Sequence, residues 1–457
     1  MADNSSSALE LGQQPIGKLL LKYSIPAVVG MVVVSLYNII DRVFIGQGVG
    51  AMAISGLALT FPLMNMVAAI GTLVGVGAAT RISIVLGMQN VKWARNILGN
   101  ALFLTFILSA VLIAPSMIWM EEILRLFGGS DQTIPYASSY LRIVIPGSVL
   151  TNLSFSFGGM MRAAGFPKKS MLVNIIGVVF NLILDPIFIF GLDMGIEGAA
   201  WATVISMAAS AVFVMVHFAD RRNEVHFERQ GFRLKKRIIR NIVSIGMAPF
   251  LMNTAGSVVN IIMNHQLYRT GGDLAIGAFG IINSYAAFIV MTILGLCQGM
   301  QPIVGYNYGA KKLKRMKDTV ILSLKVATAI MCVGFLAGEF LPRALVSVFT
   351  TDLTLREMTI PGLRTVFMCF PLIGIQIVTT QFHQSIGMAK EAIFMSLSRQ
   401  VIFLMPLIYV FGTHWGLSGV WAALPVADAT ATITAVFFLI RVKRIFYPRP
   451  AIRFKKA

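Results

Sequence analysis

The sequence predicts an all-α integral membrane protein with twelve transmembrane helices. These form two six-helix bundles related by a pseudo-two-fold axis along the membrane normal. Three observations support this fold class: a composition poor in charge, twelve long apolar runs and a weak internal repeat. Of the 457 residues, 56% are hydrophobic and 12% are charged, which is about half the charged fraction of soluble domains. Lipid is therefore the expected solvent.

Each apolar run is long enough to cross a bilayer, because about 20 helical residues cover a hydrocarbon core of about 30 Å. The first six expected spans are 17–46, 52–80, 93–119, 134–161, 169–191 and 196–219. The second six are 238–268, 274–304, 316–341, 358–386, 392–412 and 418–441. Many contain Gly or Pro, which helices in lipid tolerate better than helices in water.

Basic residues fix the expected orientation of the spans. Lys or Arg residues follow every even-numbered span, from Lys390 alone after span ten to the largest cluster in the segment after span six. The alternate loops hold only Arg125, Arg269, Arg343 and Arg356. Because cytoplasmic loops carry the excess of basic residues, we expect both termini to be cytoplasmic. The membrane is expected to be a bacterial inner membrane.

The net charge of +19 would also suit a nucleic-acid partner. The short basic clusters between apolar runs instead favour contact with anionic lipid, so no nucleic-acid partner is expected. Cys297, Cys332 and Cys369 lie in apolar stretches with neither a disulfide framework nor metal-ligand spacing. The polar segment 1–14 lacks the features of a cleaved signal peptide, so we expect uncleaved insertion.

The chain repeats weakly at a spacing of about 222 residues. The repeated pairs are Pro26 with Pro249, Gly77 with Gly299, Gly87 with Gly309, Arg142 with Arg364 and Gly165 with Gly387, and Gly195 and Gly198 match Gly416 and Gly419 after a one-residue slip. Repeats of six spans share one orientation. We therefore expect an N-terminal bundle (1–219), a cytoplasmic linker (220–237) and a C-terminal bundle with a basic tail (238–457).

Two acidic residues inside spans one and five need an explanation, because a carboxylate in hydrocarbon costs a few kcal/mol. Helical rise places Asp41 about 28 Å above Lys22 and Asp185 about 24 Å above Lys169. The two acids thus fall at similar depth. Asn181 and Asn174 precede Asp185 on one helix face, and Thr203 and Asn152 offer further oxygens.

This set of hard oxygen atoms suits Na⁺, or a proton shared between two acids. Two structural alternatives remain open. Asp41 could form a static ion pair with Arg142, and Asp185 before Pro186 could satisfy local backbone.

The second half lacks matching acids, so ion coupling is expected in the first half. Asp428 lies near mid-membrane at the depth of Arg399, and a structural ion pair between them is the favoured interpretation. Several polar residues in the spans are candidates for lining a substrate cavity: Tyr37, Asn38, Asn174, Asn260, Asn264, His265 and Gln376. Interhelical hydrogen bonding is the plainer alternative for them.

Five segments carry a resemblance to a known family: YSIPAVVG, LYNIIDRVFIG, MRAAGFPKKSM, NLILDPIFIFGLDMGIEGAAWAT and QGMQPIVGYNYGAKK. With them, nearly the whole chain resembles the multidrug and toxic compound extrusion (MATE) family, most closely its bacterial MepA-like and DinF-like branches. The resemblance implies a cation site at Asp41, Asn181, Asp185 and Thr203, with Asn152 a weaker match. The glutamate of span seven and the aspartate of span ten found in NorM-like members are absent here.

The resemblance implies an antiporter that exports amphipathic, cationic drugs in exchange for Na⁺ or H⁺. No cofactor is expected, and because twelve spans can form a complete unit alone, the monomer is expected to be functional. A flippase for lipid-linked sugars has the same superfamily shape, but it needs cavity cations to hold pyrophosphate. A membrane enzyme is the other alternative, and the sequence contains no HExxH, GxSxG or P-loop motif.

Overall fold

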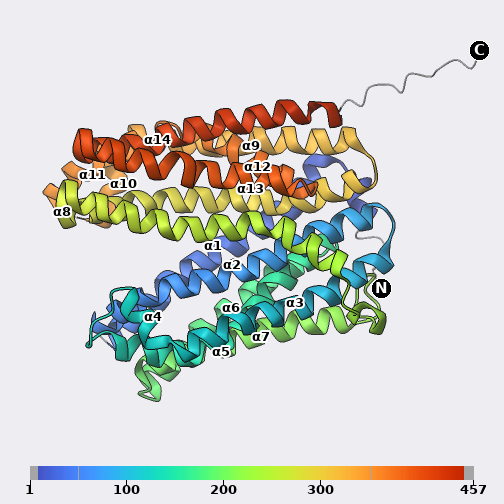
Figure 1. Cartoon of the computed structure of the whole chain (residues 1–457), viewed down its shortest axis with the longest axis horizontal. Helices are drawn as coiled ribbons and strands as arrows, with labels where there is room; N and C mark the ends of the chain where they lie inside the picture. The colour runs from blue at the N-terminus through green and yellow to red at the C-terminus, as the bar shows by residue number, and fades with distance from the viewer. Residues whose placement is uncertain (1–8, 50, 351, 447–457) are drawn as a thin grey trace, which may run out of the picture.

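The computed structural model describes residues 9–49, 51–350 and 352–446. Within these ranges the side chains at 37–39, 42–43, 46–48, 51–52, 54–55, 58 and 443–446 are not described. All regular elements of the described chain are helical. They form two bundles that lie together at one end of the molecule and diverge toward the end that carries α4 (Figure 1).

The first bundle contains the helices up to residue 219. They are η1 (Leu9–Gly12), α1 (Ile16–Gly48), α2 (Ala51–Gly87), α3 (Val91–Ile118), α4 (Met120–Leu126), α5 (Ile134–Ala163), α6 (Pro167–Pro186), the π-helical turn η2 (Ile187–Gly191) and α7 (Gly195–Ala219). A short helix, η3 (Arg229–Phe232), lies in the segment that leads to the second bundle.

The second bundle contains the remaining helices. They are α8 (Lys236–Gly309), α9 (Leu313–Phe340), α10 (Pro342–Phe349), α11 (Leu353–Phe367), α12 (Phe370–Ser385), α13 (Ala389–Leu397), the π-helical η4 (Ser398–Leu404) and α14 (Met405–Phe446). Both α8 and α14 are interrupted by a glycine with a non-helical backbone, Gly272 (φ 66°) and Gly416 (φ 59°).

The described helices supply the expected twelve spans. Nine helical segments are long and apolar enough to cross a membrane, and the bent pair α11–α12 adds a tenth. Two of these segments, Lys236–Gly309 and Ala389–Val442, turn at Gly272 and Gly416 and therefore hold two spans each. The twelve-helix membrane fold predicted from hydropathy is confirmed.

Two of the repeated glycine pairs occupy matching turns. Gly165 and Gly387 have φ of 103° and 82°, and Gly195 and Gly416 have φ of 55° and 59°. Positive φ is strained for residues with a Cβ atom but not for glycine. The repeat in the sequence therefore corresponds to a repeat in backbone conformation.

The bundles meet closely where the ends of α2 and α8 cross. A Cβ atom on Gly87 would lie 2.0 Å from the Tyr306 carbonyl oxygen, and one on Gly309 would lie 2.0 Å from the Ile84 carbonyl oxygen. These two contacts are symmetric, because Gly309 and Tyr306 are the counterparts of Gly87 and Ile84 at a spacing of 222 residues. Only glycine allows the two backbones to approach this closely.

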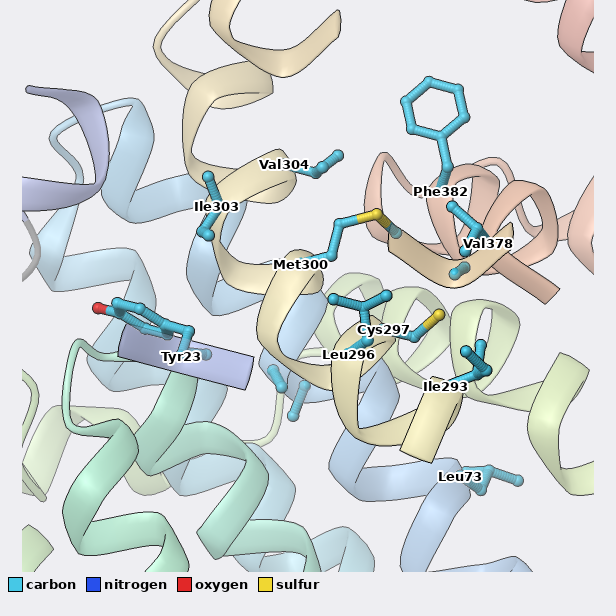
Figure 2. Packing of buried hydrophobic residues seen from close by; sticks show 14 of the residues in the cluster. Tyr23, Leu73, Ile293, Leu296, Cys297, Met300, Ile303, Val304, Val378 and Phe382 are labelled. Carbon is cyan, nitrogen blue, oxygen red and sulfur yellow. The ribbon is translucent and has the colours of Figure 1, made fainter. Parts of the chain in front are cut away.

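We call this end the basic face, because the turns at 88–90, 164–166, 220–235, 310–312 and 386–388 gather there, and Lys and Arg residues lie in or beside each of them. A buried apolar core lies beside the crossing. Figure 2 shows Cys297 and Met300 of α8 among side chains of α1, α2 and α12, with Val378 of α12 beside them. Cys297, Met300 and Val378 are at most 1% exposed, so the second half of α8 is central to the molecule.

The segment before α1 is clamped to the basic face of the second bundle. Asn307 Nδ2 donates to the Leu11 carbonyl at 3.0 Å, and Lys312 Nζ donates to the Gly12 carbonyl at 2.9 Å. Arg315 donates to the carbonyls of Leu11 (3.3 Å) and Gln14 (2.6 Å). The Leu11 side chain is fully buried. Polar residues at 307–315, in and just after the motif at 298–312, thus hold the segment before α1.

The segment at 220–235, which connects the two bundles, is hydrogen-bonded to α3. Asn100 Nδ2 donates to the carbonyls of Gly231 and Arg233 at 3.2 and 3.0 Å, and its Oδ1 accepts from the Lys235 amide at 2.8 Å. Aromatic rings strengthen the attachment, since Phe232 packs edge-on against Phe103 of α3 with ring centroids 6.0 Å apart.

The structure also corrects several sequence-based boundaries. Hydropathy gave no indication of the short helices α4 and α10, nor of the 50° bend between α11 and α12 inside the span expected at 358–386. The second span runs to Gly87 rather than residue 80. Hydropathy averages over many residues, so it does not detect local breaks or helix that extends beyond the hydrocarbon.

Candidate functional site

Two parallel helices bring the acidic residues together. A Cβ atom on Gly30 of α1 would lie 2.8 Å from Asn174 Nδ2 of α6, so the helices are close at this level. Asp41 and Asp185 each lie eleven residues further along the same helices. Eleven residues make about three turns, which returns both side chains to the shared interface. Asp41 and Asn181 are the polar side chains that face the Asp185 carboxyl.

The pocket around Asp185 is closed by polar groups of three helices. Asp185 is fully buried, and Asn181 is 1% exposed. Asn181 Nδ2 donates to Thr203 Oγ1 of α7 across a long 3.5 Å. The Tyr140 side chain of α5 also hydrogen-bonds Thr203 and lies near both acids. Four of the residues expected from the sequence, Asp41, Asn181, Asp185 and Thr203, therefore gather in one place.

The pocket holds more acceptors than donors. Among the described residues, no donor completes a hydrogen bond to either Asp185 oxygen or to the Asn181 carbonyl oxygen. A buried carboxylate without a donor is costly, and a second carboxylate beside it adds repulsion. A shared proton or a small cation would remove both costs, and carboxylate, amide and hydroxyl oxygens are ligands that suit Na⁺.

The sequence also allowed a static ion pair between Asp41 and Arg142. The Arg142 side chain is exposed on α5. Tyr140 is the site residue that sequence reasoning missed. A tyrosine that is 8% exposed inside a span needs a partner for its hydroxyl group, and this requirement was the available signal.

Two other expected residues lie away from the acids. Asn152 is twelve residues beyond Tyr140 on α5, about 18 Å along the helix, and it donates to Ser109 Oγ of α3 at 2.9 Å. In this structure Asn152 therefore lies away from the four residues that gather around Asp185. Asn174 packs on Gly30 three turns below the acids. The side chains of Tyr37 and Asn38 lie outside the described residues.

A polar stripe runs along the first half of α8, on the side that meets α2. Asn253 Nδ2 donates to Thr72 Oγ1 at 3.3 Å, and one turn later Ser257 Oγ accepts from Asn65 Nδ2 at 3.3 Å. The next residues on this face, at i+7 and i+11 from Asn253, are Asn260 and Asn264. These two residues and the adjacent His265 are exposed. The stripe thus leaves the contact with α2 as the bundles diverge (Figure 1).

Gln376 does not join this stripe. It is 6% exposed and donates to the Met395 carbonyl of α13 at 3.4 Å, so it packs inside the second bundle. The face that it occupies on α12 meets α13, so in this structure it lies away from the proposed cavity between the bundles.

Arg399 and Asp428 lie in contact, as expected from their depth. Arg399 Nε donates to Asp428 Oδ1 at 2.5 Å, with side-chain exposures of 29% and 3%. Arg399 lies in the π-helical η4 and Asp428 in α14. The pair joins these two helices.

We predict that Asp428→Asn reduces stability more than export. Losing one partner leaves Arg399 uncompensated, and the cost should be about 3 kcal/mol, the low end for a broken buried pair, because Arg399 is partly exposed. Thermal melting of the purified protein measures the loss. The double variant Arg399→Leu/Asp428→Leu should recover most of it. Normal melting combined with lost export would show that the pair acts in transport instead.

Comparison with known proteins gives a consistent picture. The MatE family model matches residues 26–187 and again 247–410, one match in each bundle. The chain is 29% identical over 435 residues to the multidrug export protein MepA of Staphylococcus aureus (strain MSSA476), covering 94% of this chain and 95% of that protein. MepA of Staphylococcus haemolyticus (strain JCSC1435) is also 29% identical over 435 residues, with the same coverage.

Solved structures agree. The MATE multidrug transporter DinF-BH, solved in a complex, is 36% identical with a TM-score of 0.89, covering 96% of this chain and 98% of that one. An outward-facing conformation of a multidrug resistance MATE family transporter has a TM-score of 0.90 at 23% identity, covering 97% and 99%. The second match supports the fold alone.

Proposed function

The chain belongs to the MatE family, and we propose that it is an antiporter that exports amphipathic, cationic organic compounds in exchange for Na⁺ or H⁺. The observation that carries this proposal is the Asp41–Asp185 pair inside the first bundle. The similar exporters favour drug export over the flippase for lipid-linked sugars. The family consists of transporters rather than enzymes.

The chemistry of coupling follows from the pocket. A proton or Na⁺ entering between the two acids removes their repulsion and lets α1 and α6 stay close. When the ion leaves, two carboxylates in a buried pocket repel each other, and the pocket favours an arrangement in which at least one acid is solvated. Asn181 and Thr203 supply further oxygens, and Tyr140 supplies a hydroxyl group that holds Thr203.

Coupling requires that ion and drug favour different states. A drug cation near the acids competes with the coupling ion for the same negative charge. We propose that the polar stripe on α8, with Asn260, Asn264 and His265, faces the drug's path between the bundles. The tight crossing of α2 and α8 would then close this path at the basic face.

Orientation and assembly complete the proposal. We place the basic face in the cytoplasm of a bacterial cell, with the protein in the inner membrane, because the Lys and Arg clusters gather there. The bundles are taken as residues 1–219 and 238–457, joined by 220–237. A single chain holds both bundles and the whole acidic pocket, so we propose that the monomer is functional.

The proposal predicts ion-driven export in a purified system. The protein is reconstituted in liposomes, and ethidium transport is followed under an imposed Na⁺ gradient and then under an imposed proton gradient. At least one gradient should drive transport against the dye gradient, and the driving ion is the one that occupies the acidic pocket. Transport that is equally fast without either gradient would contradict antiport.

A further inference from the structure

A groove of about 580 Å³ opens at the end of the second bundle opposite the basic face. It lies between the end of α9, the start of α10 and the middle of α11. Its lining combines apolar side chains, such as Phe340, with three charged ones, Arg343, Glu357 and Arg364. The groove is lined by residues of the second bundle only, whereas the acidic pocket belongs to the first, and the transport proposal does not use it.

Two charges in the groove have no counter-charge. Arg343 and Glu357 both line it, and neither forms an ion pair with any residue that the structure describes. They therefore form no direct ion pair with each other in this structure. Arg364 is held only loosely, with its Nε 3.8 Å from Glu339 Oε1 and half of its side chain exposed. The groove thus offers separate cationic and anionic sites.

The positive charge of Arg343 lies at the start of a helix, where a cation is electrostatically unfavourable. Arg343 is the second residue of α10, and no side chain caps the start of this helix. The start of a helix carries partial positive charge and attracts anions rather than cations. An anionic group bound between Arg343 and Arg364 would compensate both the arginines and the helix start.

The first bundle shows the ordinary arrangement at the equivalent place. The helix α4 follows α3 as α10 follows α9, and α3 and α9 begin and end 222 residues apart. At this spacing the counterpart of Arg343 is Glu121, an acid in the first turn of α4. The cation at the start of α10 is therefore particular to the second bundle.

An apolar stripe on α9 leads away from the groove. Val333, Leu336 and Phe340 follow at i, i+3 and i+7, which places them on one helix face. They are 67%, 48% and 73% exposed. This face is open to the surrounding lipid and passes from the charged groove toward mid-membrane. A molecule with a charged head and long apolar chains fits both parts.

We propose that the groove binds a glycerophospholipid with an ethanolamine headgroup. Its phosphate contacts Arg343 and Arg364, which can donate paired hydrogen bonds to phosphate oxygens. Its ammonium group donates to the Glu357 carboxylate, and its acyl chains lie along the exposed face of α9. Choline carries the same charge but has no N–H to donate, and a glycerol headgroup has no cation for Glu357. Both should bind more weakly.

Native mass spectrometry of the purified full-length protein tests this assignment. Phosphatidylethanolamine, phosphatidylcholine and phosphatidylglycerol with identical acyl chains are added separately, and retained lipid is counted. We expect retention of the ethanolamine lipid about tenfold above the choline lipid, as a charge-assisted hydrogen bond provides. Arg343→Gln should reduce retention of all three lipids. Glu357→Gln should remove the preference for ethanolamine and raise retention of the glycerol lipid.

The matched control is Glu121→Gln at the equivalent place in the first bundle, which should leave retention unchanged. All three substituted side chains are exposed, so folding should be preserved. Equal retention of ethanolamine and choline lipids by the unmodified protein would overturn the proposal. So would strongest retention of the glycerol lipid, or a preference unaffected by either groove variant.

Discussion

Asp185→Asn is expected to abolish ethidium export while the protein remains folded in the membrane. The amide keeps the shape of a protonated carboxyl group but cannot release a proton or attract Na⁺. The pocket would thus be held permanently in its neutral state. Asp41→Asn should have the same effect, because the two acids share one pocket. Export by cells and by proteoliposomes measures the loss, which should reach the level of empty vesicles.

Stability separates this effect from misfolding. A neutral side chain relieves the repulsion between buried acids, so the melting temperature of Asp185→Asn should be unchanged or higher. Asp193→Asn is the matched control. This acid is exposed in the turn before α7 and has φ of 53°, which Asn tolerates well. Full export by both the Asp41 and Asp185 variants would refute the ion site.

Gly87→Ala and Gly309→Ala are expected to destabilise the closed basic face. Each added Cβ would lie 2.0 Å from a backbone oxygen of the other bundle, so α2 and α8 must separate by about 1 Å. Overpacking of this kind costs about 1–3 kcal/mol, and here the obstacle is backbone, which cannot rotate away. The melting temperature should fall and export should slow. The double variant should cost less than the sum, since both changes open one crossing.

Gly280→Ala is the matched control for these variants. It is also a helical glycine of α8, but nothing lies within 4 Å of the Cβ that the change adds. Alanine favours the helix, so this variant should be as stable as the unmodified protein. If Gly87→Ala melted at the same temperature as Gly280→Ala, the bundles would not be as closely packed as described.

Properties that depend on average hydropathy and helical rise were predictable from the sequence. The twelve spans follow from apolar length. The meeting of Asp41 and Asp185 follows from equal depth, since both helices start at the same face. The sequence repeat already matched Gly87 with Gly309. Only the structure shows that Gly87 packs against the backbone of Tyr306 and that Gly309 packs against the backbone of Ile84.

Properties that depend on helix rotation and on single turns were not predictable. Asn152 and Asn181 are both buried amides, and only the packing of α3 against α5 shows that Asn152 bonds Ser109 rather than the acids. Gln376 is polar and inside a span, but its direction depends on how α12 packs on α13. The π-helical turns Ile187–Gly191 and Ser398–Leu404 change this rotation without a signal in hydropathy.

The attachment of the connecting segment to α3 bears on how the gene could be divided for co-expression of two half-proteins. A cut at 219/220 would place Phe227 and Phe232 on the second fragment, whereas α3 would be on the first. The hydrogen-bond partners of Asn100 would then belong to a different polypeptide. A cut after Lys235 would keep every tether of Asn100 on one polypeptide. The segment attached to α3 therefore ends at Lys235, whose extended backbone leads directly into α8.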